Sequence, residues 1–225
     1  MPTIRLNLLN CIWAIMMKDG LCEFRTRYAV SALFMFALIS LASISMSIGA
    51  ASLPADLTAA LLWVLLFFCA MAGLSRVFVQ EEESGTIIAL QIYGSGQAVL
   101  FGKLLFNILM LLSLTMLIIP LFIIFLNVDI YHWPIFIVVL ILGDIGIAAA
   151  STITAAVVAK TQGKNALFTV LTFPILLPQF LSSISATAKI LMNVKPDISD
   201  ILFMAAYNVV LMIASSIVFD YLWYD

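Results

Sequence analysis

The sequence predicts an all-α integral membrane protein with six transmembrane helices in one bundle. Hydrophobic residues make up 64% of the 225-residue chain and charged residues only 10%, whereas a soluble domain carries about 25% charge. Six apolar segments reach the length of about 20 residues that a helix needs to cross about 30 Å of hydrocarbon. The chain lacks the alternating pattern of a β-barrel, so helices that satisfy their own backbone hydrogen bonds are the expected architecture.

The six predicted spans follow one another along the whole chain after a polar start. They cover residues 28–49, 57–79, 98–126, 134–159, 166–186 and 199–222, and a short tail follows at 223–225. The longest connection between neighbouring spans is the loop at 80–97. We therefore expect one membrane domain at 28–222, with this loop as its largest extramembrane part.

The first 27 residues do not span the membrane, but they carry apolar side chains at helical spacing. Polar residues occupy other positions of the same helical wheel, which is typical of a helix that lies in the membrane interface. A solvated leader that packs on the bundle is the alternative. The apolar positions are Ile4, Leu8, Ile12, Ile15 and Met16, with Trp13 beside them.

The distribution of basic residues predicts the orientation in the membrane. Eight lie on one side: Arg5, Lys18, Arg25, Arg27, Arg76, Lys103, Lys160 and Lys164. Only two, Lys189 and Lys195, lie on the other. By the positive-inside rule, both termini and the 80–97 loop are cytoplasmic. Aromatic residues at the span ends are expected interface anchors, namely Tyr131 and Trp133 outside and Tyr221, Trp223 and Tyr224 inside.

The sequence carries none of the motifs expected of an enzyme or of a nucleic-acid-binding protein. It has no phosphate loop, zinc-binding H-E-x-x-H or nucleophile elbow, and the net charge of −2 comes without a basic patch. The three cysteines, Cys11, Cys22 and Cys69, form neither a disulfide framework nor a zinc site. His132 is a conceivable haem or metal ligand, although a solvated loop histidine is the commoner case. No catalytic residue, cofactor site or metal site is predicted.

Asp144 is an ionisable residue near the middle of a predicted span. Such a carboxylate costs about 2.5 to 3.5 kcal/mol at the bilayer centre, so it must face protein or water. Two readings stay open: a hydrogen-bonded residue in a tight helix interface, or a polar point on a transport path. An aspartyl dyad with Asp220 is disfavoured because the two residues lie at different depths.

Two prolines, Pro174 and Pro178, lie four residues apart on one face of the fifth span. Each removes a backbone donor, so we expect the helix to bend or break there. Broken helices mark transport sites in carriers, whereas a kinked packing helix is the more frequent finding.

The loop after the second span combines charge with exposed apolar residues. Glutamates at 81–83 leave the membrane, Gly85 can end the helix, and "TIIALQIY" follows. Charges that solubilise a turn would explain the glutamates but not the apolar residues outside the spans. We therefore expect another protein to cover this stretch.

Three motifs resemble the haem exporter protein B (CcmB) family, the permease of the ABC transporter for cytochrome c maturation. "LSRVFVQEEESGTIIAL", followed by Lys103, is similar to the family's loop between spans two and three. "NVDIYHW" resembles its outer loop through Asp129, Tyr131 and Trp133, and "LTFPILLPQFL" resembles its twin-proline span. The chain departs from the family pattern at Ser75, at Ile88 and at 94–96.

The resemblance implies an ABC-2-type permease in the bacterial inner membrane. It implies a separate ATP-binding subunit, haem-handling membrane partners, and pairing with a second copy or within a complex. Residues 81–93 would form the coupling helix that contacts the ATPase, through Glu81, Glu82, Glu83, Gly85, Ile87, Ile88, Leu90, Ile92 and Tyr93. Haem is the cargo that the family implies. A lipid or drug exporter, or a scaffold that recruits a soluble partner without transport, are the alternatives.

Overall fold

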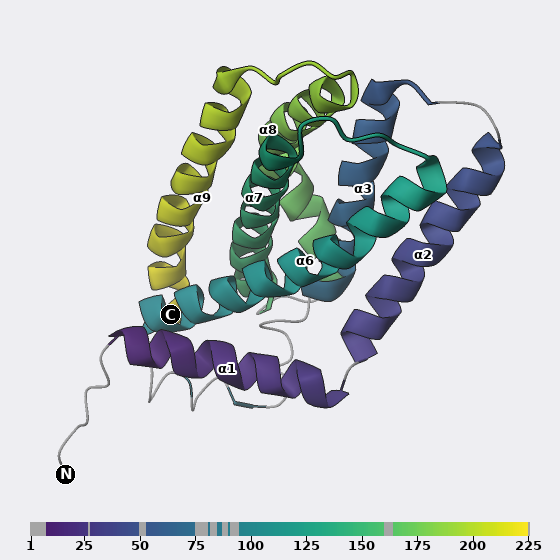
Figure 1. The fold of residues 1–225 in the computed structure, drawn as a ribbon. Helices are drawn as coiled ribbons and strands as arrows, with labels where there is room; N and C mark the ends of the chain where they lie inside the picture. Colours follow the sequence, from purple (N-terminus) through teal and green to yellow (C-terminus); the bar gives the residue numbers. More distant parts are fainter. Residues whose placement is uncertain are drawn as a thin grey trace, which may run out of the picture.

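A computed structural model describes residues 8–26, 28–49, 53–74, 81, 85–86, 90, 95–159 and 164–224. Within these residues all regular structure is helical (Figure 1). The helices are α1 (Leu8–Thr26), α2 (Tyr28–Ile48), α3 (Ala55–Leu74), α6 (Gly96–Leu126), α7 (Trp133–Ala159), α8 (Lys164–Leu191) and α9 (Ile198–Tyr224). All but α1 are long and apolar enough to cross a membrane. The predicted six-helix membrane fold is therefore confirmed.

The helix ends differ from the predicted span ends where polar contacts prolong a helix. The fifth span was expected to end at 186, but α8 continues to Leu191. Lys189 in its last turn contacts Asp197 at 2.6 Å and Asp200 at 2.8 Å, which fastens this end to α9. The predicted end of the second span, at 75–79, lies outside the described residues.

The central helix of the bundle is α7, which packs against α3, α6, α8 and α9 (Figure 1). Of its spanning residues, 67% are buried, against 17% for α2 at the edge of the bundle. The outer faces carry large apolar side chains such as Met46 and Ile124. An apolar exterior suits contact with lipid, because hydrocarbon cannot satisfy polar groups.

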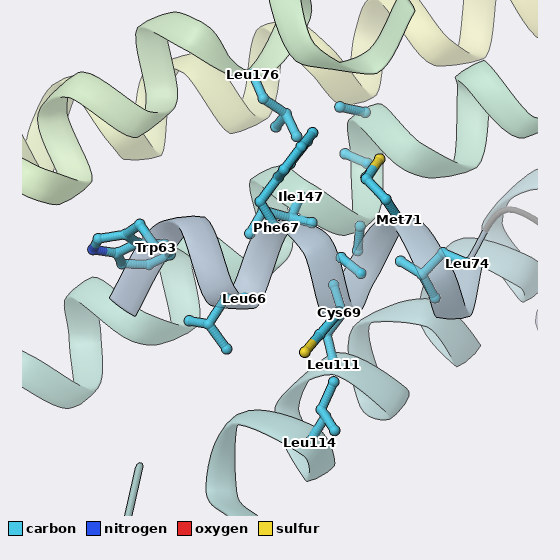
Figure 2. Close-up of a cluster of buried hydrophobic side chains, with 14 of the residues drawn as sticks. Trp63, Leu66, Phe67, Cys69, Met71, Leu74, Leu111, Leu114, Ile147 and Leu176 are labelled. Carbon is cyan, nitrogen blue, oxygen red and sulfur yellow. The ribbon is translucent and has the colours of Figure 1, made fainter. Parts of the chain in front are cut away.

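The apolar core lies around α3, whose side chains reach three other helices (Figure 2). Phe67 packs edge-on against Phe173 and Phe180 of α8, with ring centroids 5.8 and 5.5 Å apart. Trp63 lies so close to α7 that a Cβ at Gly143 would come within 2.0 Å of its ring. The Trp63 indole also donates a hydrogen bond to Thr187 Oγ1 at 3.0 Å. Glycine at 143 therefore permits the close packing of α3 on α7.

The helix α1 lies across one end of the bundle, along the first part of α6, at the end that also holds the C-terminus (Figure 1). Ile15 and Met16 are buried, and a Cβ at Gly102 would come within 2.9 Å of Ile15. The helix thus packs on the bundle, as one of the two alternatives expected. It also leaves a stripe of apolar side chains exposed at four-residue spacing, as an interfacial helix requires: Leu9, Trp13, Met17 and Leu21.

Trp223 was predicted to anchor the protein at the membrane interface, but it lies inside the bundle. It is buried, stacks on Phe219 with centroids 5.3 Å apart, and would contact a Cβ at Gly96 at 2.9 Å. The glycine at the start of α6 leaves room for this ring, so Trp223 joins α9 to α6. Tyr221 is 74% exposed and keeps the position expected of an anchor.

The prolines of α8 do not break the helix, which continues through both. A proline leaves the carbonyl one turn earlier without its helical donor, and neighbouring groups can support such a turn. Tyr207 of α9 donates its hydroxyl to the Ile175 carbonyl at 2.6 Å, between Pro174 and Pro178. The carbonyls that lose a helical donor are those of Val170 and Pro174, so this hydrogen bond joins the proline-containing turn of α8 to α9 without replacing a lost donor.

Candidate functional site

Four charged side chains meet where α1 crosses α6, and we call them the ion cluster: Lys18, Asp19, Glu81 and Lys103. Lys103 of α6 is only 1% exposed and lies 3.2 Å from Asp19 Oδ2 and 3.3 Å from Glu81 Oε1. Lys18 of α1 contacts the same two carboxylates, including a hydrogen bond to Glu81 Oε1. The cluster therefore links the predicted coupling loop to two helices at once.

The ion cluster strongly favours the charged form of Glu81. Burial alone would raise its pKa, but the charge of Lys103 and hydrogen bonds from Lys18 and Thr86 lower it to about 2. For Lys18, burial alone would lower the pKa, and the hydrogen bond with Glu81 and the charge of Asp19 outweigh it, so its pKa is raised. Both residues hold their charges at neutral pH.

The described part of the loop folds back onto Glu81. Gly85 adopts a φ of 69°, a conformation that glycine tolerates best. The Thr86 amide then donates to the Glu81 carbonyl at 3.1 Å, and the Thr86 hydroxyl donates to the Glu81 carboxylate. The Leu90 amide donates to the Thr86 carbonyl at 3.1 Å, and Leu90 packs against the hydrophobic core.

These contacts place Glu81 and Leu90 on the inner side of the loop, although the sequence suggested an outer, partner-facing role. The residues Glu82, Glu83, Ile87, Ile88, Ile92 and Tyr93 lie outside the described residues. Sequence reasoning missed the part that Lys18 and Asp19 play. The available signal was Lys103, a lone charge in the apolar α6 that required a partner.

Asp144 is fully buried near the middle of α7. Thr115 of α6 interacts with it, but neither carboxylate oxygen has a hydrogen-bond partner of good geometry within the described protein. Nearer to the ion cluster, Asn107 of α6 donates to Thr152 Oγ1 of α7 at 2.8 Å. Polar side chains thus lie along the contact between α6 and α7.

The opposite face of α7 is joined to α8 and α9 by two buried amides. Gln179 and Asn208 both donate to the Leu142 carbonyl, at 3.1 and 2.8 Å. Leu142 and Asp144 lie about 200° apart around the helix at about 100° per residue. Gln179 directly follows Pro178 in α8. The part of α8 next to the second proline therefore contacts the face of α7 opposite Asp144.

The predicted outer loop follows the left-handed cap of α6 at Asn127, whose φ is 48°. Asp129, Tyr131 and Trp133 are all exposed, as an outward-facing surface requires. Trp133 is the first residue of α7 and packs edge-on against Phe136 one turn later in the same helix, with ring centroids 6.2 Å apart. His132, directly before this helix, is half-buried.

Asp220 lies far along the chain from Asp144 and has a different partner. It accepts a hydrogen bond from Gln97 Nε2 at 2.8 Å, and Ser216 donates to Gln97 Oε1 at 3.1 Å. These contacts join the end of α9 to the start of α6. The arrangement agrees with the expectation that the two aspartates form no dyad.

Comparison with protein families identifies one matching model, described as CcmB protein, over residues 10–219. A search of curated proteins finds no significant match. The matched region runs from α1 into the last turns of α9 and includes the ion cluster, Asp144 and the outer loop. The chain therefore belongs to the CcmB family and is a multi-pass membrane permease component of haem export for cytochrome c maturation.

Proposed function

We propose that this permease couples ATP hydrolysis by a separate ABC subunit to movement of its membrane helices in the bacterial inner membrane. Its termini and the 80–97 loop face the cytoplasm, where that subunit binds. The observation that carries this proposal is the ion cluster, which fastens the loop to α1 and α6 through Glu81.

A loop that transmits force needs a stiff connection to the helices it moves. Lys103 is almost fully buried, and opposite charges attract more strongly there than in water. Removing one member of a buried pair costs about 3 to 5 kcal/mol, because the other charge is left uncompensated. A displacement of Glu81 would therefore carry α6 and α1 with it.

The loop residues that the structure describes hold the loop in place. Glu81, Gly85, Thr86 and Leu90 hold the loop to the bundle through the contacts described above. We assign docking of the ATP-hydrolysing subunit to the remaining predicted residues. These are Glu82, Glu83, Ile87, Ile88, Ile92 and Tyr93.

The division of labour within the complex follows from what the sequence contains. The chain has no phosphate loop, so a partner must bind and hydrolyse ATP. We further propose that the permease pairs with a second copy or within a larger complex, and that haem-handling membrane partners accept or supply the cargo. We assign the transport path within the membrane to Asp144, Pro174 and Pro178. We assign its exit to the outer-loop residues Asp129, Tyr131 and Trp133.

Reconstitution with the ATP-hydrolysing subunit tests docking and transmission separately. Ile87→Asp should weaken binding of that subunit by about tenfold or more, because an interface must then desolvate a charge. Glu81→Gln should leave binding intact but reduce the stimulation of ATP turnover by the permease. Lys189→Met removes a lysine from ion pairs at the opposite end of the bundle and is the matched control, expected to change neither quantity.

Two outcomes would contradict the proposal. Unchanged binding and turnover in Ile87→Asp would remove the docking role of the loop and favour a scaffold that contacts its partner elsewhere. The second outcome concerns Glu81→Gln protein whose lowered stability shows that the ion cluster is disrupted. If the permease still stimulates ATP turnover normally in this variant, the ion cluster does not transmit movement.

A further inference from the structure

The contact between α6 and α7 contains a line of buried polar residues, interrupted on α6 by the apolar Leu111, and we call this line the polar seam: Asn107, Thr115, Asp144, Ser151 and Thr152. On α6, Lys103, Asn107 and Thr115 follow one another at multiples of four residues and share one buried face. The seam therefore begins one turn beyond the ion cluster and ends near the middle of the membrane.

The register of the two helices aligns the seam residues. The Asn107–Thr152 hydrogen bond of 2.8 Å joins the antiparallel helices at one level. Eight residues along α6 and eight back along α7 lead to Thr115 and Asp144, which interact with each other. Ser151 lies two helical turns from Asp144 on the same face of α7.

Most of the unsatisfied polar atoms of the described protein belong to this seam. Five of the eight buried side-chain atoms without a hydrogen-bond partner are Asn107 Oδ1, Thr115 Oγ1, Ser151 Oγ and both oxygens of Asp144. Buried polar groups are ordinarily hydrogen-bonded, and bound water supplies the partners that protein groups do not. Such a concentration along one line indicates bridging water between α6 and α7.

The surroundings of Asp144 favour its neutral, protonated form. An ionised carboxylate in an apolar interior requires a compensating charge, and Asp144 is fully buried with neither of its oxygens hydrogen-bonded within the described protein. The charged residues of the helices that pack on α7 all lie toward helix ends: Asp56, Lys103, Lys164, Lys189, Asp200 and Asp220.

The remaining ionisable groups of these helices are also neutral or remote. Tyr207 of α9 donates its hydroxyl to the Ile175 carbonyl. Cys69 of α3 lies in the apolar core near Leu111 (Figure 2). Tyr221 and Tyr224 lie in the last turn of α9. Among the described side chains of these helices, none therefore offers Asp144 a cation.

We propose that Asp144 is a proton-binding site of the permease, reached from the end that holds the ion cluster through water along the polar seam. Asp144 is protonated in the arrangement described here. When α6 and α7 separate, its O–H bond breaks, the proton passes to seam water, and a carboxylate remains. This proton site is independent of the coupling function proposed above, since it requires neither the loop nor an ATPase.

Infrared spectroscopy of the purified permease in lipid vesicles tests the protonation state directly. The wild-type protein should show the carbonyl band of a protonated carboxyl group at neutral pH. Asp144→Asn should abolish the band, whereas Asp220→Asn, which alters a carboxylate hydrogen-bonded to Gln97, should retain it. Absence of the band in wild type, or its persistence in Asp144→Asn, would overturn the proposal.

Hydrogen–deuterium exchange of the same band tests the path. Asn107→Leu should slow exchange by about tenfold or more, since exchange would then require an unfavourable opening of about 1.4 kcal/mol or more. Gln179→Leu is the matched control, because Gln179 of α8 is an equally buried amide that packs against the opposite face of α7. Exchange equal to wild type in folded Asn107→Leu protein would refute the path.

Thr115→Val provides a second variant if the leucine substitution prevents folding. It removes one hydroxyl and keeps the side-chain shape, and it should also slow exchange. Equal exchange in this variant and wild type would refute the path in the same way. Loss of ATPase binding in these variants is not expected, so failure of the proton site and failure of the coupling loop are distinguishable.

Discussion

Replacing Glu81 by glutamine measures how strongly the cytoplasmic loop is fastened to α6. The ion cluster lowers the Glu81 pKa from its ordinary value of 4.5 to about 2. One pKa unit corresponds to about 1.4 kcal/mol, so at neutral pH the cluster stabilises the folded state through Glu81 by about 3 kcal/mol. Glu81→Gln keeps the shape of the side chain and should remove most of this stabilisation.

The pH dependence of the effect follows from the direction of the shift. A carboxylate with a lowered folded-state pKa contributes stability that is fully present above its unfolded pKa of 4.5 and is lost as the pH falls toward about 2. The difference in unfolding free energy between wild type and Glu81→Gln should therefore be constant from pH 7 to about 5 and shrink below pH 4.5.

A double-mutant cycle with Lys103→Met assigns the effect to the ion cluster. Lys103→Met should also cost about 3 to 5 kcal/mol, because it removes the buried cation that both Asp19 and Glu81 contact. The double variant should cost less than the sum of the single variants. Reversible unfolding in mixed micelles, followed by helix content, gives the four free energies. Additive costs, or a Glu81→Gln effect below about 0.5 kcal/mol, would refute the interpretation.

Three further predictions concern packing and orientation. Gly143→Ala should destabilise the bundle by about 1 to 3 kcal/mol, since the added Cβ would lie 2.0 Å from the Trp63 ring; an unchanged melting temperature would contradict the close contact. Thr187→Val removes the acceptor of the Trp63 indole and should cost about 1 to 3 kcal/mol, accompanied by a change in tryptophan fluorescence. In protein without its native cysteines, Ser84→Cys should resist an impermeant reagent in intact cells while Asp129→Cys reacts, and the reverse result would invert the topology.

The six spans were predictable because lipid imposes a strong constraint on composition and length. Their ends were less predictable, since hydropathy reports where the apolar segment ends and not where the helix ends. At the end of α8, Lys189 bonds to Asp197 and Asp200 and extends the helix beyond the apolar run. Trp223 shows the same limit, because the sequence cannot reveal the space left by Gly96.

The candidate site was predictable in location but not in its internal contacts. Glu81 stood out as part of a charged loop, yet its partner Lys18 comes from a helix more than 60 residues earlier. Such pairings depend on how α1 lies across α6, which no local pattern encodes. Asp144 stood out for the opposite reason, because a carboxylate in an apolar span requires buried surroundings wherever the helix lies.

The two amides on the Leu142 carbonyl have a mechanical consequence for the whole molecule. Gln179 and Asn208 bind α8 and α9 to α7 at one point, and Trp63 adds α3 through Thr187. On the other side, α1 and α2 pack on α6. Two groups of helices follow from these contacts: α3, α7, α8 and α9 form one, and α1, α2 and α6 form the other. The groups meet where α6 packs on α7, where α2 packs on α3, and where Asp220 of α9 accepts from Gln97 of α6. We expect relative motion of the two groups to change the contact between α6, which carries Lys103, and α7, which carries Asp144.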